Sequence, residues 1–147
     1  MNFFNLGKHI LFLKYVSQKR LLMKKNIIKN FKKAIKNNID YIQITNPIAE
    51  QDIYFRATGK TTSIIKLANK YNLPILSKGN DVHIRFVCNE LELDLPVIYH
   101  VKDTTLLRGM RKILVDETVT IDDIKKIKNE NPMIKIIGFA RIKIKNK

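Results

Sequence analysis

The residue types and order most suited to binding a phosphate in this 147-residue chain are found at Gly59, Lys60, Thr61 and Thr62. They lie where a short apolar segment gives way to an amphipathic one, so a strand is expected to turn into a helix there. A helix N-terminus directs N–H groups and positive potential at one point, and glycine lets an anion approach the backbone. Lys60 could reach the terminal phosphates, Thr61 could ligate Mg²⁺, and Thr62 could contact the first phosphate. With Thr58 they form the expected nucleotide-binding segment; the alternative is a chance Gly-Lys-Thr in a lysine-rich chain.

A second group is the acidic pair Asp116 and Glu117, which directly follows the apolar residues 112–115. Asp116 at a strand end could hold Mg²⁺, usually through water, and Glu117 could polarise an attacking water as general base. Open α/β sheets bind ligands at the carboxyl ends of their strands, where both groups are expected. The alternative is a solvated loop or helix start that merely contains two acids.

With these two motifs, residues 51–140 resemble a compact P-loop NTPase of the division with an extra strand and a catalytic glutamate. They are similar to small phage-type ATPases and cut-down helicase-like cores. The resemblance implies ATP or GTP as substrate and Mg²⁺ as cofactor. It implies catalytic roles for Lys60 and Glu117 and metal-binding roles for Thr61 and Asp116. Hydrolysis by such a core alone is expected to be slow unless a protein partner supplies an arginine finger.

The chain departs from the family pattern in its loop. GxxxxGK[ST] would place a glycine at position 54, which is Tyr54, and a loop one residue shorter would place it at Phe55. The strand expected at 134–139 lacks the polar sensor of many relatives, although Arg141 follows it. Three further arginines could neutralise phosphate charge or simply be solvated: Arg56, Arg108 and Arg111.

Strand-like and helix-like patterns alternate between residues 51 and 140. Strands that are apolar on both faces, joined by amphipathic helices, are typical of a parallel sheet covered by helices. We therefore predict a three-layer P-loop-type α/β fold with a mainly parallel five-stranded sheet, its strands at 53–55, 73–76, 96–101, 113–115 and 133–139.

The formal net charge of +15 is unevenly distributed. Residues 1–50 contain ten basic side chains and two acidic ones, and residues 136–147 contain four basic side chains and no acid. The middle of the chain carries only +3. This division predicts a basic helical extension (1–50), the P-loop NTPase-like domain (51–140) and a basic tail (141–147). The basic ends could contact nucleic acid, or could reflect an AT-rich coding sequence.

Residues 19–37 predict a basic amphipathic helix with its apolar side chains on one face. Such a helix could lie on an anionic membrane or a nucleic-acid backbone. The interpretation favoured here packs the apolar face on the sheet and leaves the lysines in solvent. No run approaches the roughly 20 apolar residues of a membrane span, and no signal-peptide pattern is present. An intracellular, cytoplasmic location is therefore expected, with peripheral membrane contact as an alternative. Met23 is a second plausible start of translation, so the sequence does not decide whether residues 1–22 are a genuine part of the protein.

The remaining chemistry-bearing residues point to no second site. Cys88 is the one cysteine, which excludes an internal disulfide and a multi-cysteine zinc site. The histidines are too scattered for a metal cluster. The sequence thus predicts nucleotide binding with slow Mg-dependent hydrolysis, linked to nucleic-acid metabolism. Two alternatives stay open: a degenerate P-loop fold acting as a non-catalytic basic nucleic-acid-binding accessory, and a membrane-surface protein anchored by its N-terminal region.

Overall fold

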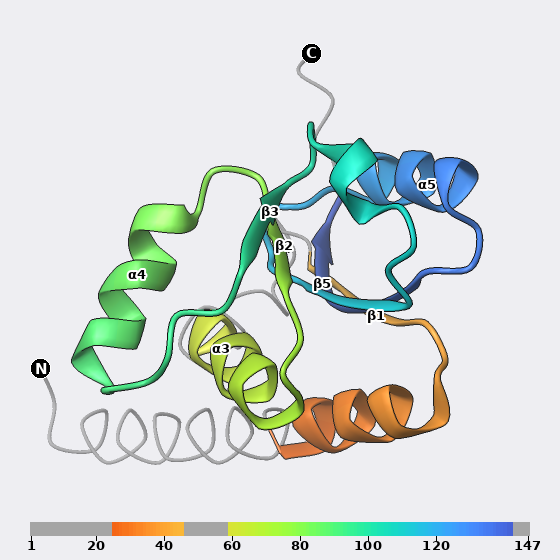
Figure 1. The fold of residues 1–147 in the computed structure, drawn as a ribbon. Helices are drawn as coiled ribbons and strands as arrows, with labels where there is room; N and C mark the ends of the chain where they lie inside the picture. Colours follow the sequence, from red (N-terminus) through yellow and green to blue (C-terminus); the bar gives the residue numbers. More distant parts are fainter. Residues whose placement is uncertain (1–24, 46–58, 143–147) are drawn as a thin grey trace, which may run out of the picture.

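Five short strands, all parallel, form the centre of the computed structural model, which describes residues 25–45 and 59–142 (Figure 1). The prediction of an α/β fold with a five-stranded sheet is confirmed. In chain order the elements are a helix over residues 25–37, β1 (Tyr41–Thr45), α3 (Lys60–Tyr71), β2 (Ile75–Ser77), α4 (Asp81–Glu90), β3 (Ile98–His100), the 3₁₀ turn η1 (Thr104–Leu107), β4 (Lys112–Val115), α5 (Ile121–Glu130) and β5 (Lys135–Arg141).

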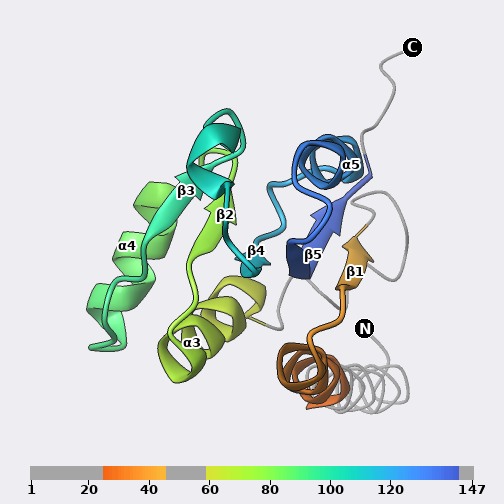
Figure 2. The same ribbon diagram turned by 45° about the vertical axis from the view of Figure 1, so that its right-hand side comes forward.

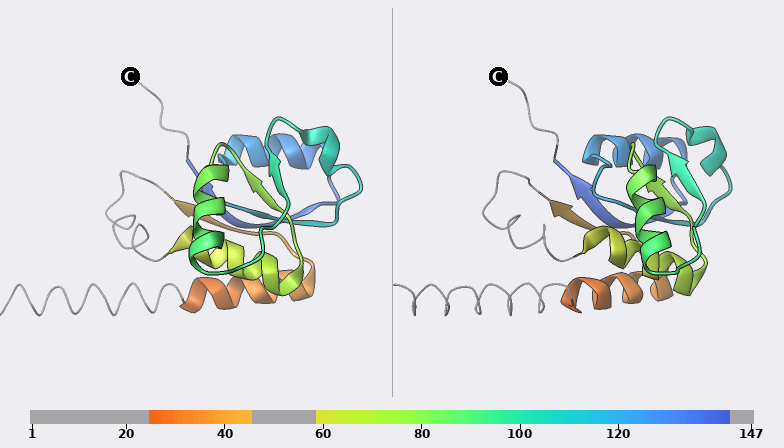
Figure 3. Two further views of the ribbon diagram at one scale, coloured as in Figure 1. Left: turned by 60° about the vertical axis from the view of Figure 1, so that its left-hand side comes forward. Right: turned by 90° about the vertical axis from the view of Figure 1, so that its left-hand side faces the viewer.

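The strand order across the sheet is β1-β5-β4-β2-β3. Consecutive residues of a strand point to opposite faces, so each face of a doubly covered sheet has its own core. Ile75, Leu114 and Ile137 belong to the core shared with residues 25–37, α3 and α4. Leu76 and Val115 belong to the other core, with α5 and η1. Figures 2 and 3 show helices on both sides of the sheet, which agrees with a three-layer arrangement.

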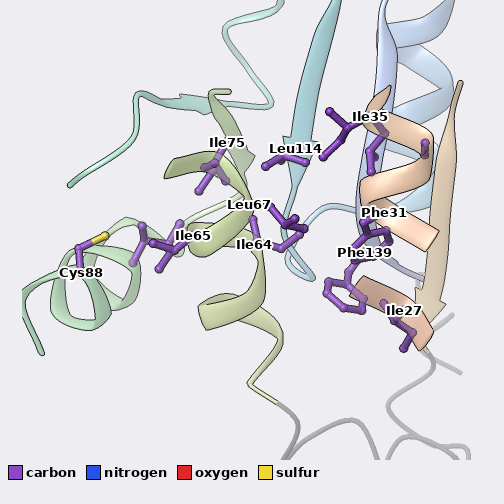
Figure 4. Close-up of a cluster of buried hydrophobic side chains, with 14 residues drawn as sticks. Ile27, Phe31, Ile35, Ile64, Ile65, Leu67, Ile75, Cys88, Leu114 and Phe139 are labelled. Carbon is purple, nitrogen blue, oxygen red and sulfur yellow. The ribbon is translucent and has the colours of Figure 1, made fainter. Parts of the chain in front are cut away.

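The helix of residues 25–37 packs into the first core. Phe31 is fully buried, and its ring meets those of Tyr41 and Phe139 edge-on, with centroids 5.7 and 5.2 Å apart. Ile27 and Ile35 are buried beside it (Figure 4). The apolar face therefore packs on the sheet and leaves lysines outside, as the favoured interpretation predicted.

The strand that precedes α3 in the described part of the chain is β1. The first strand predicted from the sequence, at 53–55, lies outside the described residues, and residues 41–45 fall within the predicted extension. Instead, 41–45 pairs in parallel with β5 along its whole length, Tyr41 opposite Ile137 and Thr45 opposite Arg141. Residues 25–45 thus share one sheet and one core with residues on the far side of the predicted boundary at 50.

The start of β1 is held to β5 by Asp40. Its Oδ1 accepts a hydrogen bond from the Ile136 amide at 2.8 Å, and its Oδ2 accepts one from Lys128 Nζ at 2.9 Å. Burial alone would raise the pKa of this carboxyl group. The Ile136 hydrogen bond and the contact with Lys128 outweigh burial and hold the pKa below its ordinary value of 3.8.

We expect Asp40→Asn to lower the free energy of unfolding at neutral pH, with the loss disappearing in acid. A folded-state pKa below the unfolded one stabilises the fold above the unfolded pKa, about 4, and this stabilisation is lost as pH falls through the folded value. Urea unfolding of both proteins between about pH 2 and pH 7 measures the effect. A difference that did not change with pH would contradict this role for Asp40.

Candidate functional site

The candidate site lies at the carboxyl edge of the sheet. Because the strands are parallel, the end of β2 at Ser77 and the end of β4 at Val115 share this edge. Asp116 and Glu117 follow β4 directly, and the first turn of α3 carries Lys60. The structure therefore brings the two predicted motifs to one place.

Lys60 and Glu117 form an ion pair, with Lys60 Nζ 2.9 Å from Glu117 Oε2. The side chain of Lys60 is 5% exposed and that of Glu117 is 31% exposed. A lysine at this depth requires a charged partner, since an unpaired buried ammonium group is costly. The same position would let the ammonium group interact with an anion bound at the helix N-terminus.

Gly59 sets the backbone at the start of α3. Its φ of 69° and ψ of 49° are left-handed, a conformation that glycine adopts without strain. The Gly59 carbonyl accepts hydrogen bonds from the amide and the hydroxyl of Ser63, at 2.9 and 3.0 Å. The first turn of α3 contains no acidic residue, whereas α4 and α5 each have acids there. The first N–H groups of a helix lack partners within it, so this turn favours an anion.

Asp116 is almost completely buried, at 1% exposure. Its Oδ1 accepts hydrogen bonds from the amide and the hydroxyl of Thr118. Its Oδ2 is buried and has no hydrogen-bond partner among the residues described. A buried carboxylate oxygen without a partner is costly and uncommon in native proteins, so it calls for a ligand or another physical explanation.

The oxygen donors of the two motifs suit Mg²⁺ better than a metal held wholly by protein. No group of three His, Cys, Asp or Glu side chains in the described parts of the chain could hold a metal ion. Mg²⁺ is bound by one or two protein oxygens together with phosphates and waters. The Asp116 carboxylate and the hydroxyl of the buried Thr61 are oxygens of this kind.

Sequence reasoning missed two residues of this edge, Ser77 and Thr118. The Thr118 hydroxyl uses its one proton to donate to Asp116. The Ser77 hydroxyl oxygen lies 3.3 Å from Thr118 Oγ1, so in this contact Ser77 must be the donor and Thr118 the acceptor. Two backbone amides of the loop after β2 complete this hydrogen-bond network. The amide of Lys78 donates to Thr118 Oγ1 at 2.8 Å, and the amide of Asn80 donates to Ser77 Oγ at 3.1 Å. A buried serine at the end of an apolar strand was the available signal.

The loop after β2 is also joined to α5. Lys78 Nζ lies 3.3 Å from Asp123 Oδ2, and Asp123 forms a capping box with Thr120 at the start of the helix. Burial alone would raise the pKa of Asp123, but the hydrogen bonds from Thr120 and Lys78 outweigh it and lower that pKa. The capping box fixes the start of α5 and so the segment that follows Glu117.

The other predicted residues lie in different places. Thr58 and Arg56 fall outside the described residues, and Thr62 is half-buried in the first turn of α3. Arg141 ends β5 at the carboxyl edge, where its amide donates to the Val119 carbonyl at 2.8 Å.

Two arginines lie at the opposite edge of the sheet. Arg111 directly precedes β4, and Arg108 lies in a pocket with the C-terminal residues of α5, which lead into the start of β5. Neither is placed to neutralise a phosphate at Lys60.

Cys88 belongs to the first core rather than to the site. It is 4% exposed, and burial raises the pKa of its thiol, which disfavours the nucleophilic thiolate. Cys88 therefore packs as a small apolar residue of the first core.

Comparison with protein families, with curated proteins and with solved structures found no significant match. No helix in the described ranges is long and apolar enough to cross a membrane.

Proposed function

We propose that this chain is a small P-loop NTPase that binds a nucleoside triphosphate, ATP in the first instance, with Mg²⁺ and hydrolyses it slowly. The observation that carries the proposal is the Lys60–Glu117 ion pair at the start of α3, together with the buried Asp116, which directly precedes Glu117 in the chain. A helix start suited to phosphate, a buried carboxylate with an unpartnered oxygen and a partly exposed carboxylate are the groups that this chemistry would use.

The triphosphate would lie against the first turn of α3. There Gly59 permits close approach, the amides of the turn donate to phosphate oxygens, and Lys60 neutralises negative charge. In binding, the phosphates would compete with Glu117 for the Lys60 ammonium group. The ion pair therefore describes the state before the nucleotide binds.

Asp116 and Thr61 would hold the magnesium ion, which supplies charge neutralisation on the phosphate oxygens. The unpartnered Oδ2 of Asp116 would then gain a partner, while Oδ1 stays oriented by Thr118. Ser77 positions Thr118 in turn, so the carboxylate is held in one orientation by β2 as well as by β4.

Glu117 would act as the general base once it leaves Lys60. A water oxygen attacks the γ-phosphorus, the bond to the bridging oxygen of the diphosphate breaks, and the water proton passes to the Glu117 carboxylate. Charge at the leaving oxygen needs neutralisation, and Arg108 and Arg111 lie at the far edge. An arginine supplied by a protein partner would therefore accelerate turnover.

The strand order gives independent support. The resemblance implies a division with an extra strand, and β5 lies between β1, the described strand that precedes the phosphate segment, and β4, which carries the acids. Because β5 is parallel to β4, it also ends, with Arg141, at the edge that carries Asp116.

Calorimetric titration with MgATP tests the proposal, comparing the unchanged protein with Lys60→Ala. Loss of a charged hydrogen-bonding group costs about 1.5–3 kcal/mol, so the variant should bind at least about tenfold more weakly. Lys66→Ala is the matched control, because it removes an exposed lysine from the same helix and should bind normally. Equal heats for the unchanged protein and Lys60→Ala, or no heat for either, would exclude the proposed site; thermal melts verify that both variants fold.

A further inference from the structure

A row of five lysines covers the outer face of the helix of residues 25–37, which contains no acid. At 3.6 residues per turn the five fall within an arc of about 100°, and they extend about 16 Å along the helix axis. They line an open groove of about 570 Å³ together with Ile28. The row, called the lysine face below, consists of Lys25, Lys29, Lys32, Lys33 and Lys36.

The opposite side of this helix is fixed in the core. Ile27, Phe31 and Ile35 are at most 8% exposed, and Lys112 Nζ donates to the Ile35 carbonyl at 2.8 Å. The helix lies beside α3 at the outside of the molecule (Figures 1 and 2). The lysine face is therefore presented on a rigid support.

Acidic side chains of the described residues do not neutralise the charge of this face. Within the described part of the chain, none of its lysines forms an ion pair with a carboxylate. The nearest acid in sequence, Asp40, is engaged by Lys128 and the Ile136 amide. A surface of this kind attracts a partner that carries regularly spaced negative charge.

We propose that the lysine face binds the phosphate backbone of a nucleic acid. Along the axis of a duplex each strand places a phosphate about every 3.4 Å, so a lysine face lying along that axis spans the rise of about five phosphates. An anionic membrane is the weaker candidate, because interfacial helices bury their apolar face in the bilayer, and here that face is inside the protein. Contact through lysines alone reads no base sequence, so the binding is sequence-independent.

Fluorescence anisotropy with a labelled oligothymidylate and a labelled mixed-sequence duplex tests this proposal, without nucleotide. Affinity should fall steeply between about 50 and 200 mM salt. The double variant Lys29→Gln/Lys33→Gln should reduce the slope of log K against log salt by about 1.4 for the single strand, and lower affinity about 25-fold near 0.1 M salt. Both side chains are exposed, so the fold should be unaffected.

Lys125→Gln/Lys126→Gln is the matched control. It removes the same charge from exposed positions of α5, which covers the other face of the sheet. The control should keep the slope of the unchanged protein. Equal losses in the two double variants would overturn the proposal, as would absence of binding at the lowest salt, or binding to phosphatidylserine vesicles but to neither nucleic acid. None of these outcomes depends on Lys60, so the nucleotide proposal is tested separately.

Discussion

Glu117→Gln is expected to lower the rate of MgATP hydrolysis by about 10²- to 10⁴-fold, the usual contribution of a general base. Glutamine has almost the same shape and can still accept a hydrogen bond from Lys60, but its amide cannot take the proton of the attacking water. Phosphate release under saturating nucleotide, in the unchanged protein and in the variant, measures the effect.

Binding should respond in the opposite direction from hydrolysis. In the unliganded protein Glu117 holds Lys60 through a charged contact of 2.9 Å, and the phosphates must displace it. A neutral glutamine weakens that competition, so MgATP should bind at least as tightly as before. Glu130→Gln removes the same charge at the exposed end of α5 and should change neither quantity. An unchanged hydrolysis rate, or loss of binding together with hydrolysis, would exclude Glu117 as the base.

The parallel sheet could be predicted because its strands have an unambiguous pattern. The strand β4 is apolar at Ile113, Leu114 and Val115, and these side chains enter both cores. Only a strand covered on both faces requires this. The helix of residues 25–37 was also predictable, because its apolar residues recur every three to four positions and so lie on one face, with the lysines on the other.

The first strand of the sheet could not be assigned from local pattern. Residues 41–45 include the polar Gln43, and β1 has a single neighbour in the described sheet, β5. Its identity depends on pairing with residues 137–141, far away in sequence, and on Phe31 packing against Tyr41. Residues 53–55 matched a strand equally well by composition and lay nearer to Gly59, so sequence alone favoured them.

The candidate site residues were predicted from their side-chain chemistry, whereas the two missed residues could be recognised only from their contacts in the structure. Lys60, Asp116 and Glu117 have types and positions that indicate phosphate and metal binding. Ser77 and Thr118 matter because β2 and β4 are neighbours, a fact of topology that no short motif contains. Hydroxyl groups at the end of a strand acquire a role only when the adjacent strand is known.

The close contact between β4 and β5 beside the site leads to the second prediction, on Gly138. This residue is buried in β5 opposite Val115 and has a φ of 143°. A Cβ atom there would collide with the Val115 carbonyl oxygen and lie 2.9 Å from the Val115 amide nitrogen. Both are backbone atoms in the middle of the sheet, so a small side-chain rotation cannot relieve the collision.

Gly138→Ala should therefore reduce the free energy of unfolding by about 4 kcal/mol or more, measured by urea unfolding. Gly109→Ala separates collision from backbone strain, because Gly109 also has a positive φ, 80°, but open space around its Cβ position. That variant should lose only about 1–2 kcal/mol. Equal losses of unfolding free energy in the two variants would contradict the collision and attribute both losses to backbone strain. Any Gly138→Ala protein that folds must move β4 away from β5 to relieve the collision. Because Asp116 directly follows Val115, this movement would also displace Asp116. The variant should therefore bind MgATP more weakly, although position 138 is not a predicted ligand.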